Sequence, residues 1–370
     1  MTRVCLNMIV KDEAHVIERC LRSVRPFIDS WVIVDTGSTD GTQDRIRALM
    51  GDMPGRLYER PWKDFGYNRT EAIGLAREFG EYLFIIDADE VLHLPPGYQR
   101  PPLGGSSYAI EMEMGAIRYG RVCVINASLP WRYVGVLHEY LECGQAVESP
   151  RLPDVRAVVH TDGGRSQGIS VIDKYAHDAR QLEQALIDEP DNTRYVFYLA
   201  QSYRDSAQPQ SALLNYERRA QMGGWIEEVW YSLYSAALLA EQLGHGQDSV
   251  VCRYLNAYEA RPERGGEALG QLARYCREAG QFALARLFAE QAMGIPVPDD
   301  TLFVDTSWYQ WRADDEYAIA SYWTAHYDQS RRVCEELLAS PELPAMQRPR
   351  VLANLNFALD KLGLPQRPAD

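Results

Sequence analysis

The sharpest chemical signal in this sequence is an acidic tetrapeptide, Asp87-Ala88-Asp89-Glu90, which directly follows the apolar run 82–86. Two carboxylates separated by one residue project to the same side of an extended segment. Hard oxygen ligands of this kind suit Mg²⁺ or Mn²⁺, which in turn bridges phosphate oxygens. An Asp-x-Asp pair alone is also an ordinary polar strand end, but its place after a buried-looking strand favours a divalent-cation site at Asp87 and Asp89.

A second signal lies earlier, where the apolar run 30–34 ends at Asp35 and a turn rich in Gly, Ser and Thr opens a helix at Thr42. Such a turn offers free backbone N–H groups and lets a ligand approach the chain closely at Gly37. The Asp35 carboxylate is placed to accept hydrogen bonds from a ribose or a base edge. The alternative is an ordinary capped helix start, but the turn is longer than a cap requires.

The elements that must position these residues alternate in type through the first half of the chain. The runs 4–10, 30–34, 57–59 and 82–86 read as strands, the segments 15–24, 42–49 and 68–79 as helices, and 108–114 with 121–125 as a later pair of strands. Ser38, Thr39 or Asp40 is expected to cap the second helix. This rhythm predicts a parallel sheet covered on both faces, whose ligands bind at the carboxyl ends of the strands.

The second half of the chain has a helical period instead. Leu272, Ala273, Cys276, Gly280, Ala285, Ala289 and Ala292 have tetratricopeptide spacing, and weaker copies start near Leu199, Trp230 and Ala318. Small residues at these places let paired helices approach closely. We therefore predict a short α-solenoid, in which stacked helix pairs bury the faces that a single pair leaves exposed.

The motifs of the first half, taken in order, resemble those of family 2 glycosyltransferases. The shared features are Lys-Asp-Glu after the first strand, the turn after Asp35, the motif Trp62-x-Asp64-Phe65-Gly66-x-Asn68-Arg69, and Asp-Ala-Asp-Glu. The fused repeats resemble bacterial family 2 enzymes that carry tetratricopeptides, including peptide S-glycosyltransferases of bacteriocin pathways. The resemblance implies a Rossmann-like GT-A domain with a mostly parallel sheet over residues 1–168 and an all-α tetratricopeptide-like solenoid over 169–370.

The resemblance also implies where a nucleotide-sugar donor would bind. Asp35 would contact the uracil or ribose, with Gly37 in the turn beside it. Lys11, Asp12 and Glu13 would line the same pocket from the end of the first strand. The family usually has Asn at the position of Asp12, so this chain changes the local charge next to the expected base contact.

Roles in the transfer itself follow from the same resemblance. Asp89 would be the main metal ligand, Asp87 would contact the ribose or reach the metal through water, and Arg69 would lie near the diphosphate, which suits its fixed charge. The metal and the arginine would stabilise the departing nucleoside diphosphate.

An inverting transfer also needs a carboxylate that takes the acceptor's proton. Glu139, at the end of the apolar run 133–137, is our candidate for this base, although the Glu-Asp pair that usually supplies it in the family is absent. His138 is either a further metal ligand, an orienting partner of Glu139 or a polar core residue. His160, which ends the run 157–159, is a weaker candidate for completing the metal site. Trp62, Trp131 and Tyr133 are positioned to stack on sugar or base, but each alone is better explained as a core residue.

Composition narrows the remaining possibilities. A formal net charge of -14 argues against binding to nucleic acid, and seven cysteines without a Cys-x-x-Cys motif favour a reducing cytoplasm over a disulfide framework. The start of the chain lacks the features of a signal peptide, and no window reaches the ~18 apolar residues of a membrane span. We therefore expect a soluble cytoplasmic protein.

The leading hypothesis is a metal-dependent hexosyltransferase that uses a UDP-linked hexose or N-acetylhexosamine and acts on a peptide, a protein or a glycan. The repeats are expected to hold the acceptor or a second copy of the chain. The main alternative is a non-catalytic tetratricopeptide scaffold with a degenerate sugar-nucleotide-binding domain. A nucleotidyltransferase ranks last because the sequence has no convincing basic Gly-rich phosphate loop near its start.

Overall fold

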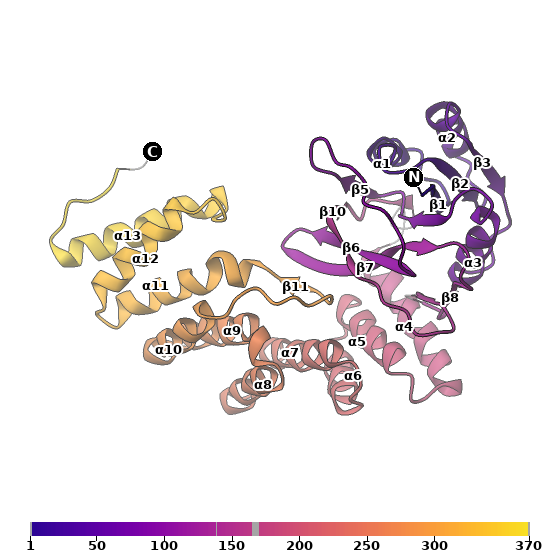
Figure 1. The fold of residues 1–370 in the computed structure, drawn as a ribbon. Coiled ribbons are helices and arrows are strands. Elements are labelled where there is room, and N and C mark those ends of the chain that lie inside the picture. The colour runs from indigo at the N-terminus through magenta and orange to yellow at the C-terminus, as the bar shows by residue number, and fades with distance from the viewer. Residues whose placement is uncertain (1, 138, 165–169, 369–370) are drawn as a thin grey trace. The chain divides into compact units, whose positions relative to one another are not determined.

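The fold is known from a computed structural model that describes residues 2–137, 139–164 and 170–368 (Figure 1). The chain divides into two compact units, residues 1–208 and 209–370. The sheet of the first unit ends before residue 168, and the unit continues with two further helices. The domain boundary at 168/169 stays a prediction. The two compact units meet at 208/209, whereas the change from strands to helices falls between Val159 and Val171.

The first unit combines a mixed sheet, a two-stranded hairpin and flanking helices. Its elements are β1 Val4–Val10, α1 Ile17–Val24, β2 Ser30–Asp35, α2 Thr42–Met50, β3 Gly55–Glu59, α3 Phe65–Ala76, β4 Tyr82–Ile85, β5 Glu90–His93, β6 Ser107–Met114, β7 Ile117–Asn126, β8 Arg132–Val134, β9 Tyr140–Glu142, β10 Arg151–Val159, α4 Val171–Asp188 and α5 Thr193–Asp205.

The strands of the main sheet follow the order β3-β2-β1-β4-β7-β6-β10-β5. Strands β3, β2, β1 and β4 are parallel neighbours, as the alternation of strands and helices predicts. β7 joins β4 in the antiparallel sense and forms a hairpin with β6, which confirms the later strand pair. β1, β2 and β4 are almost wholly buried, since their near-continuous apolar sequences suit strands covered on both faces.

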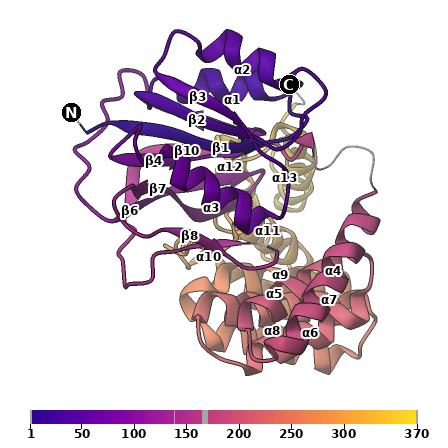
Figure 2. The ribbon, with the colours of Figure 1, turned by 90° about the vertical axis from the view of Figure 1, so that its right-hand side faces the viewer.

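Helices cover both faces of the parallel strands (Figure 2). α1 and α2 pack against one another and share a core with β1, to which Ile17 and Leu21 contribute. α3 packs on β1 and β2, where Ile73 and Ala76 join a second core. The expected start of one helix was wrong. α3 begins at Phe65 rather than Asn68 because the Asp64 side chain accepts the Tyr67 N–H and so caps the helix there. α2 begins at Thr42, as expected, after Gly41, whose φ of 90° is left-handed, and the Asp40 side chain accepts the Thr42 N–H at 3.0 Å.

The second unit is helical apart from short irregular segments. Its elements are α6 Pro209–Gln221, α7 Ile226–Gln242, α8 Gln247–Ala260, the 3₁₀ turn Pro262–Arg264, α9 Gly265–Glu278, α10 Phe282–Met293, β11 Val304–Asp305, the π turn Trp308–Arg312, α11 Ala313–Trp323, α12 Tyr327–Ala339, the 3₁₀ turn Ala345–Gln347 and α13 Arg348–Leu362. Each helix from α6 to α13 packs against the next along the chain, as in a solenoid.

The residues with tetratricopeptide spacing lie where that role requires them. Leu272, Ala273 and Cys276 of α9 are buried, as are Ala285 and Ala289 of α10. Small side chains at these positions bring the two helices together. Trp230 and Tyr234 of α7 stack at 5.0 Å between ring centroids inside the unit's core, which agrees with a packing role for these aromatics. Among the described residues, no helix is long and apolar enough to span a membrane.

Candidate functional site

The candidate site lies where the parallel strands β1, β2 and β4 end side by side. Val10 of β1 pairs in register with Asp35 of β2, and Asn7 of β1 pairs with Ile85 of β4. The three loops that follow these strands therefore start at the same sheet edge. They carry the segment 11–16, the turn 36–41 and the acidic turn 87–90, so the fold brings together motifs that are far apart in the sequence.

Asp35 is buried at this edge and only half of its carboxylate is satisfied. Oδ1 accepts the backbone N–H groups of Gly37 and Ser38, each at 2.9 Å, and the side-chain amide of Gln43 at 3.2 Å. Oδ2 is buried and has no hydrogen-bond partner among the residues that the structure describes. A buried acceptor without a partner is costly, so a donor group from a ligand is the expected complement. Gly37 itself, with φ of 108°, needs the left-handed backbone that glycine adopts freely.

The Lys-Asp-Glu segment after β1 is held against the same turn. Asp12 has φ of 55°, a left-handed value that Asp and Asn tolerate better than most residues. Its N–H donates to Ser38 Oγ at 2.8 Å, and its Oδ1 accepts the Thr39 N–H at 2.8 Å. Asp12 thus shapes the loop rather than leaving its carboxylate free. Lys11 is exposed at the end of β1.

Glu13 lies on the inner side of that segment. Its Oε2 accepts the Gly164 N–H at 3.0 Å, and its own N–H donates to Thr42 Oγ1. Burial, reinforced by the negative charges of Asp89 and Asp87, raises the pKa of Glu13 to about 7. The site therefore already contains more negative charge than its surroundings stabilise.

Arg69 links the acidic turn to the proposed base. Its Nη2 donates to Asp87 Oδ1 at 2.7 Å, and its Nε donates to Glu139 Oε1 at 2.9 Å. The guanidinium also lies over the Tyr133 ring, with 5.5 Å from Cζ to the centroid. The structure thus brings together three residues that the sequence had placed in the site.

The motif around Arg69 explains how that side chain is aimed. Asp64 caps α3, and the buried Asn68 accepts the Lys63 N–H and donates to the Pro61 carbonyl, which fixes the loop before the helix. Gly66 faces the hairpin β8–β9, where a Cβ would make an ordinary contact at 3.6 Å from the Gly135 carbonyl oxygen. The same hairpin carries Glu139, so the helix and the hairpin set the position of Arg69 relative to Glu139.

A second arginine, which the sequence analysis missed, holds the other side of the acidic turn. Arg121 of β7 donates from Nη1 to Glu90 Oε1 at 2.7 Å and from Nη2 to Glu90 Oε2, and its Nη1 lies 3.6 Å from Asp87 Oδ2. Burial acts to raise the pKa of Asp87, but the guanidiniums of Arg69 and Arg121 outweigh it and lower that pKa. The only sequence signal was a basic residue within a strand, which does not reveal its partner.

Asp89 has a different environment. Burial and the charge of Asp87 raise the pKa of its carboxyl group. The segment after β10 closes over it: the His160 N–H donates to the Asp89 carbonyl at 3.2 Å, and a Cβ on Gly163 would lie 3.2 Å from Asp89 Oδ2. Arg19 pairs with Asp162 in that segment and reaches the Asp89 carbonyl oxygen at 3.4 Å. Of the two aspartates of the turn, Asp89 is thus the one whose pKa is raised.

The other candidates contribute less. His138 lies outside the described residues. His160 is exposed, and its recorded contact with the acidic turn is made by its backbone N–H rather than by its ring. Trp131 is a buried core residue, Tyr133 lies beside Arg69 and burial raises its pKa to about 12, and Trp62 is exposed and packs edge-on against Phe65.

The acidic turn fits a divalent cation that is held partly by these carboxylates and partly by the phosphates of a bound substrate. Among the described residues, no group of three or more His, Cys, Asp or Glu side chains is arranged to hold a metal by itself. Mg²⁺ is commonly held by one or two carboxylates and by substrate phosphates, and Asp89 with Asp87 offers such a pair. The raised pKa values of Asp89 and Glu13 show that added positive charge would be stabilising there.

Comparison with known proteins agrees with this geometry. Residues 5–94, which carry β1, β2 and β4 and the acidic turn, match the sequence profile of Glycosyl transferase family 2. The N-terminal part of the chain is therefore similar to family 2 glycosyltransferases, and a region of successively packed helices follows it.

Relatives match either most of the chain or one part of it. A TPR repeat-containing protein of Synechococcus elongatus is 27% identical over 313 residues, which covers 79% of this chain and 75% of that protein. The SPbeta prophage-derived glycosyltransferase SunS of Bacillus subtilis is 33% identical over 88 residues, 24% of this chain and 20% of SunS. Among solved structures, a tetratricopeptide repeat protein from Parabacteroides merdae is 20% identical, covers 52% of this chain and 69% of its own, and has a TM-score of 0.38.

Proposed function

We propose that this glycosyltransferase domain moves a sugar from a nucleotide-sugar donor to an acceptor with the help of Mn²⁺ or Mg²⁺. The donor is a UDP-linked hexose or N-acetylhexosamine, the acceptor a peptide, protein or glycan, and the transfer inverts the anomeric carbon. The observation that carries the proposal is the convergence of Asp35, Arg69, Asp87, Asp89 and Glu139 at one sheet edge. One carboxylate oxygen there, Asp35 Oδ2, is buried without a hydrogen-bond partner among the described residues.

The nucleoside would bind at the β2 end of the site. The unsatisfied Asp35 Oδ2 is an acceptor, so it selects a group that donates, such as a ribose hydroxyl or the imide N–H of uracil. Lys11, exposed at the end of the neighbouring strand, supplies a positive charge close to this end. Both contacts favour a ribonucleotide over a free sugar as the bound group.

The diphosphate would bind at the β4 end. Asp89, with Asp87 behind it, would hold the cation, whose contribution is to neutralise charge on the departing diphosphate. Arg69 stays positively charged and holds Asp87 in place through its Nη2. The segment 160–164, which covers Asp89, limits access of water to this end.

Glu139 would accept the acceptor's proton. Its carboxylate is mostly buried, and its Oε1 is fixed by Arg69 Nε, which orients the group. As the acceptor oxygen or sulfur bonds to the anomeric carbon, its proton passes to Glu139 and the bond to the diphosphate breaks. Fixing one carboxylate oxygen leaves the other to take the proton without reorganisation.

The test begins with the intact chain and a panel of nucleotide sugars. We expect UDP-sugar hydrolysis or transfer that requires Mn²⁺ or Mg²⁺ and disappears on chelation. Asp89→Asn, which keeps the size of the side chain, should lower turnover by about 10²–10³-fold while the thermal unfolding midpoint stays equal or rises. Full turnover in that variant would remove Asp89 from the cation site.

The proposed base needs a separate test. Glu139→Gln keeps a polar group beside Arg69 but cannot take a proton. We expect donor binding, followed by calorimetry with UDP and Mn²⁺, to persist while turnover falls by about 10²–10⁴-fold. Unchanged turnover would exclude Glu139 as the base.

A scaffold function is the second candidate, because the Synechococcus elongatus relative that covers most of this chain is named for its repeats alone. A scaffold would bind no nucleotide sugar. Absence of any thermal shift with UDP-sugars, with and without Mn²⁺, would favour it over the enzyme.

A further inference from the structure

The acidic turn is closed by one of its own side chains. The Asp87 N–H donates to Glu90 Oε2 at 3.0 Å, and the Glu90 N–H donates to the Asp87 carbonyl at 3.1 Å. These two hydrogen bonds form a ring that spans the turn from its first residue to its last. Asp89 lies between these two residues, so the conformation that presents both aspartates depends on a side-chain acceptor at position 90.

Glu90 needs a positive partner to stay in that position. Its side chain is only 3% exposed, and a buried carboxylate without a partner is strongly destabilising. Arg121 supplies the partner through both of its Nη atoms. β7 pairs with β4 up to Phe84 opposite Val124, so Arg121 lies just beyond the end of β4, next to the turn.

Arg121 also acts on Asp87. Its Nη1 lies 3.6 Å from Asp87 Oδ2, while Arg69 Nη2 occupies Oδ1 at 2.7 Å. Asp87 therefore has a guanidinium on each oxygen, whereas no ion pair to Asp89 is recorded among the described residues. The two aspartates of the motif are unequal because of Arg69 and Arg121.

We propose that Glu90 and Arg121 are positioning residues for the cation site. Glu90 holds the turn by accepting the Asp87 N–H, and Arg121 neutralises the charges of Glu90 and Asp87. Asp89 is then the acid left to bind the metal. This inference rests on the proposed function. It adds a charge balance: removing Glu90 makes the surroundings of Asp89 more positive, and removing Arg121 makes them more negative.

The test measures Mn²⁺ affinity by calorimetry at a fixed UDP concentration, with a protein-free blank. Glu90→Gln keeps an acceptor for the Asp87 N–H but removes a negative charge, so Mn²⁺ should bind roughly tenfold more weakly. Arg121→Met removes a positive charge and should tighten Mn²⁺ binding by a similar factor. In the double variant, which loses both charges, the affinity should return close to that of the wild type.

Two controls separate positioning from general effects. Arg118→Met removes the same charge from the same strand, but three residues away and therefore on the opposite face of the sheet, so it should not change Mn²⁺ affinity. A second double variant, Glu90→Ala with Arg121→Met, has the same net charge as the first but no acceptor for the Asp87 N–H. Its turnover should fall at least tenfold below that of the first double variant, Glu90→Gln with Arg121→Met.

The outcomes distinguish this inference from the proposed function. If the wild type shows no Mn²⁺ binding with UDP, the proposed function fails. If the wild type binds but Glu90→Gln and Arg121→Met shift the affinity in the same direction, or not at all, only the positioning role fails. Should Arg121→Met not fold, Glu90→Gln and the first double variant still decide, because neither leaves a buried unpaired carboxylate.

Discussion

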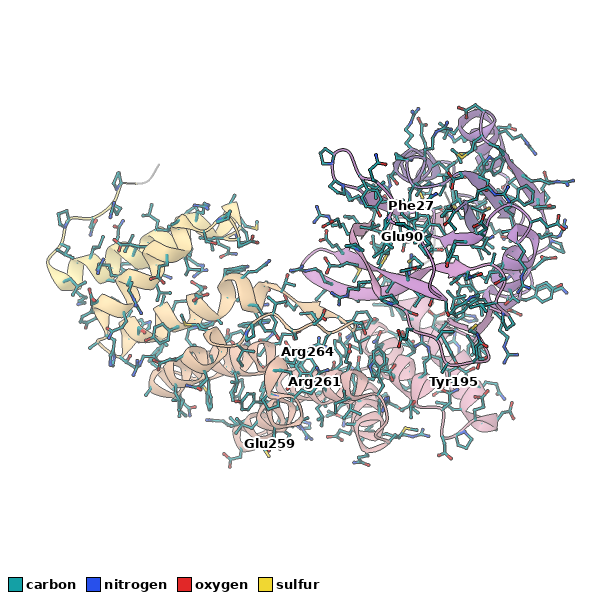
Figure 3. The ribbon with its side chains drawn as sticks, viewed as in Figure 1. Phe27, Glu90, Tyr195, Glu259, Arg261 and Arg264 are labelled. Carbon is teal, nitrogen blue, oxygen red and sulfur yellow. The ribbon has the colours of Figure 1, made fainter. Side chains whose placement is uncertain are left out.

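Two arginine-centred clusters, one in each unit, use the same chemical groups to different ends. In the helical unit, Arg264 donates to Glu267 at 2.9 Å, to Asp300 at 3.1 Å and to the carbonyls of Leu302 and Phe303 at 2.7 and 2.6 Å. Its guanidinium also lies 4.0 Å from the Trp230 ring centroid. Figure 3 labels Arg264 and its neighbour Arg261, which completes the pairing of Asp300.

The Arg264 cluster is balanced and fully connected. Glu267 also accepts the Asp305 N–H and the Tyr309 hydroxyl, so the cluster fastens the segment between α10 and α11 to the start of α9. Close packing adds to this: a Cβ on Gly270 would lie 2.3 Å from the Trp308 ring. A network whose charged groups are all paired specifies a structure and leaves no charge for a ligand to neutralise.

The cluster at the sheet edge differs in its charge. Arg69 and Arg121 pair with Asp87, Glu90 and Glu139, and the carboxylates of Glu13 and Asp89, whose pKa values are raised, add further acid. Asp35 adds a buried oxygen without a partner. An excess of acid costs stability and is retained where it binds something positive. The difference between the clusters is thus a physical criterion for separating a structural network from a binding site.

The largest effect should come from breaking the balanced cluster. Arg264→Met leaves Glu267 buried without its guanidinium partner and removes one of the two arginines that pair with Asp300, so we expect the free energy of unfolding to fall by about 3–5 kcal/mol. Chemical denaturation followed by circular dichroism measures this change. Added Mn²⁺ should restore none of it, because the geometry around Arg264 is built for a guanidinium.

A matched control is Arg286→Met, which removes an arginine whose Nη1 lies 3.9 Å from Glu290 on the surface of α10. That change should stay within about 0.5 kcal/mol of the wild type. If both variants lost equal stability, the Arg264 network would have no special role.

A smaller effect is expected from Arg69→Met at the sheet edge. Asp87 and Glu139 would lose their shared partner, and without metal the free energy of unfolding should fall by about 2 kcal/mol, less than for the fully buried network. Here Mn²⁺ with UDP should recover part of the loss, since ligand that binds only the folded state stabilises it. Denaturation curves with and without Mn²⁺ measure the recovery.

Arg69→Lys sharpens this comparison. Lysine keeps the charge but lacks the fork that reaches two carboxylates at once, so its stability should lie between those of the wild type and Arg69→Met. Recovery of Arg264→Met by Mn²⁺, or no recovery of Arg69→Met, would contradict the distinction between the clusters.

The sequence allowed most of the sheet edge to be predicted because the information there is local. The strand 4–10 was placed correctly, since a continuous apolar run ends in charged residues. The family resemblance placed Arg69 in the site, but it did not predict the pairing of Arg69 with Asp87 and Glu139. Arg121 could not be found, because its pairing with Glu90 joins residues 31 apart through the sheet. Likewise, nothing in the local sequence showed that Arg264 would anchor the segment after α10.

The smallest predicted effect concerns Glu13 and depends on pH. Burial first, and the neighbouring charges of Asp89 and Asp87, raise its pKa from 4.5 to about 7, so the folded protein keeps a proton that the unfolded chain releases. The stability that this group contributes is therefore complete below about pH 4.5 and lost as the pH rises through about 7. Glu13→Gln lacks this titration, so above neutral pH it should be more stable than the wild type by on the order of 1 kcal/mol, after allowance for solvent screening.

Unfolding free energies measured across the acidic to alkaline range test this prediction, with Glu78→Gln, at an exposed carboxylate just after α3, as the control. The gap between Glu13→Gln and the wild type should widen as the pH rises, whereas the control should run parallel to the wild type. Added Mn²⁺ with UDP should narrow the gap at high pH, because a cation at Asp89 would stabilise the ionised form of Glu13. A gap that did not change with pH would mean that the sheet edge holds no excess acid at Glu13, and the contrast with the Arg264 network would then rest on Asp35 and Asp89 alone.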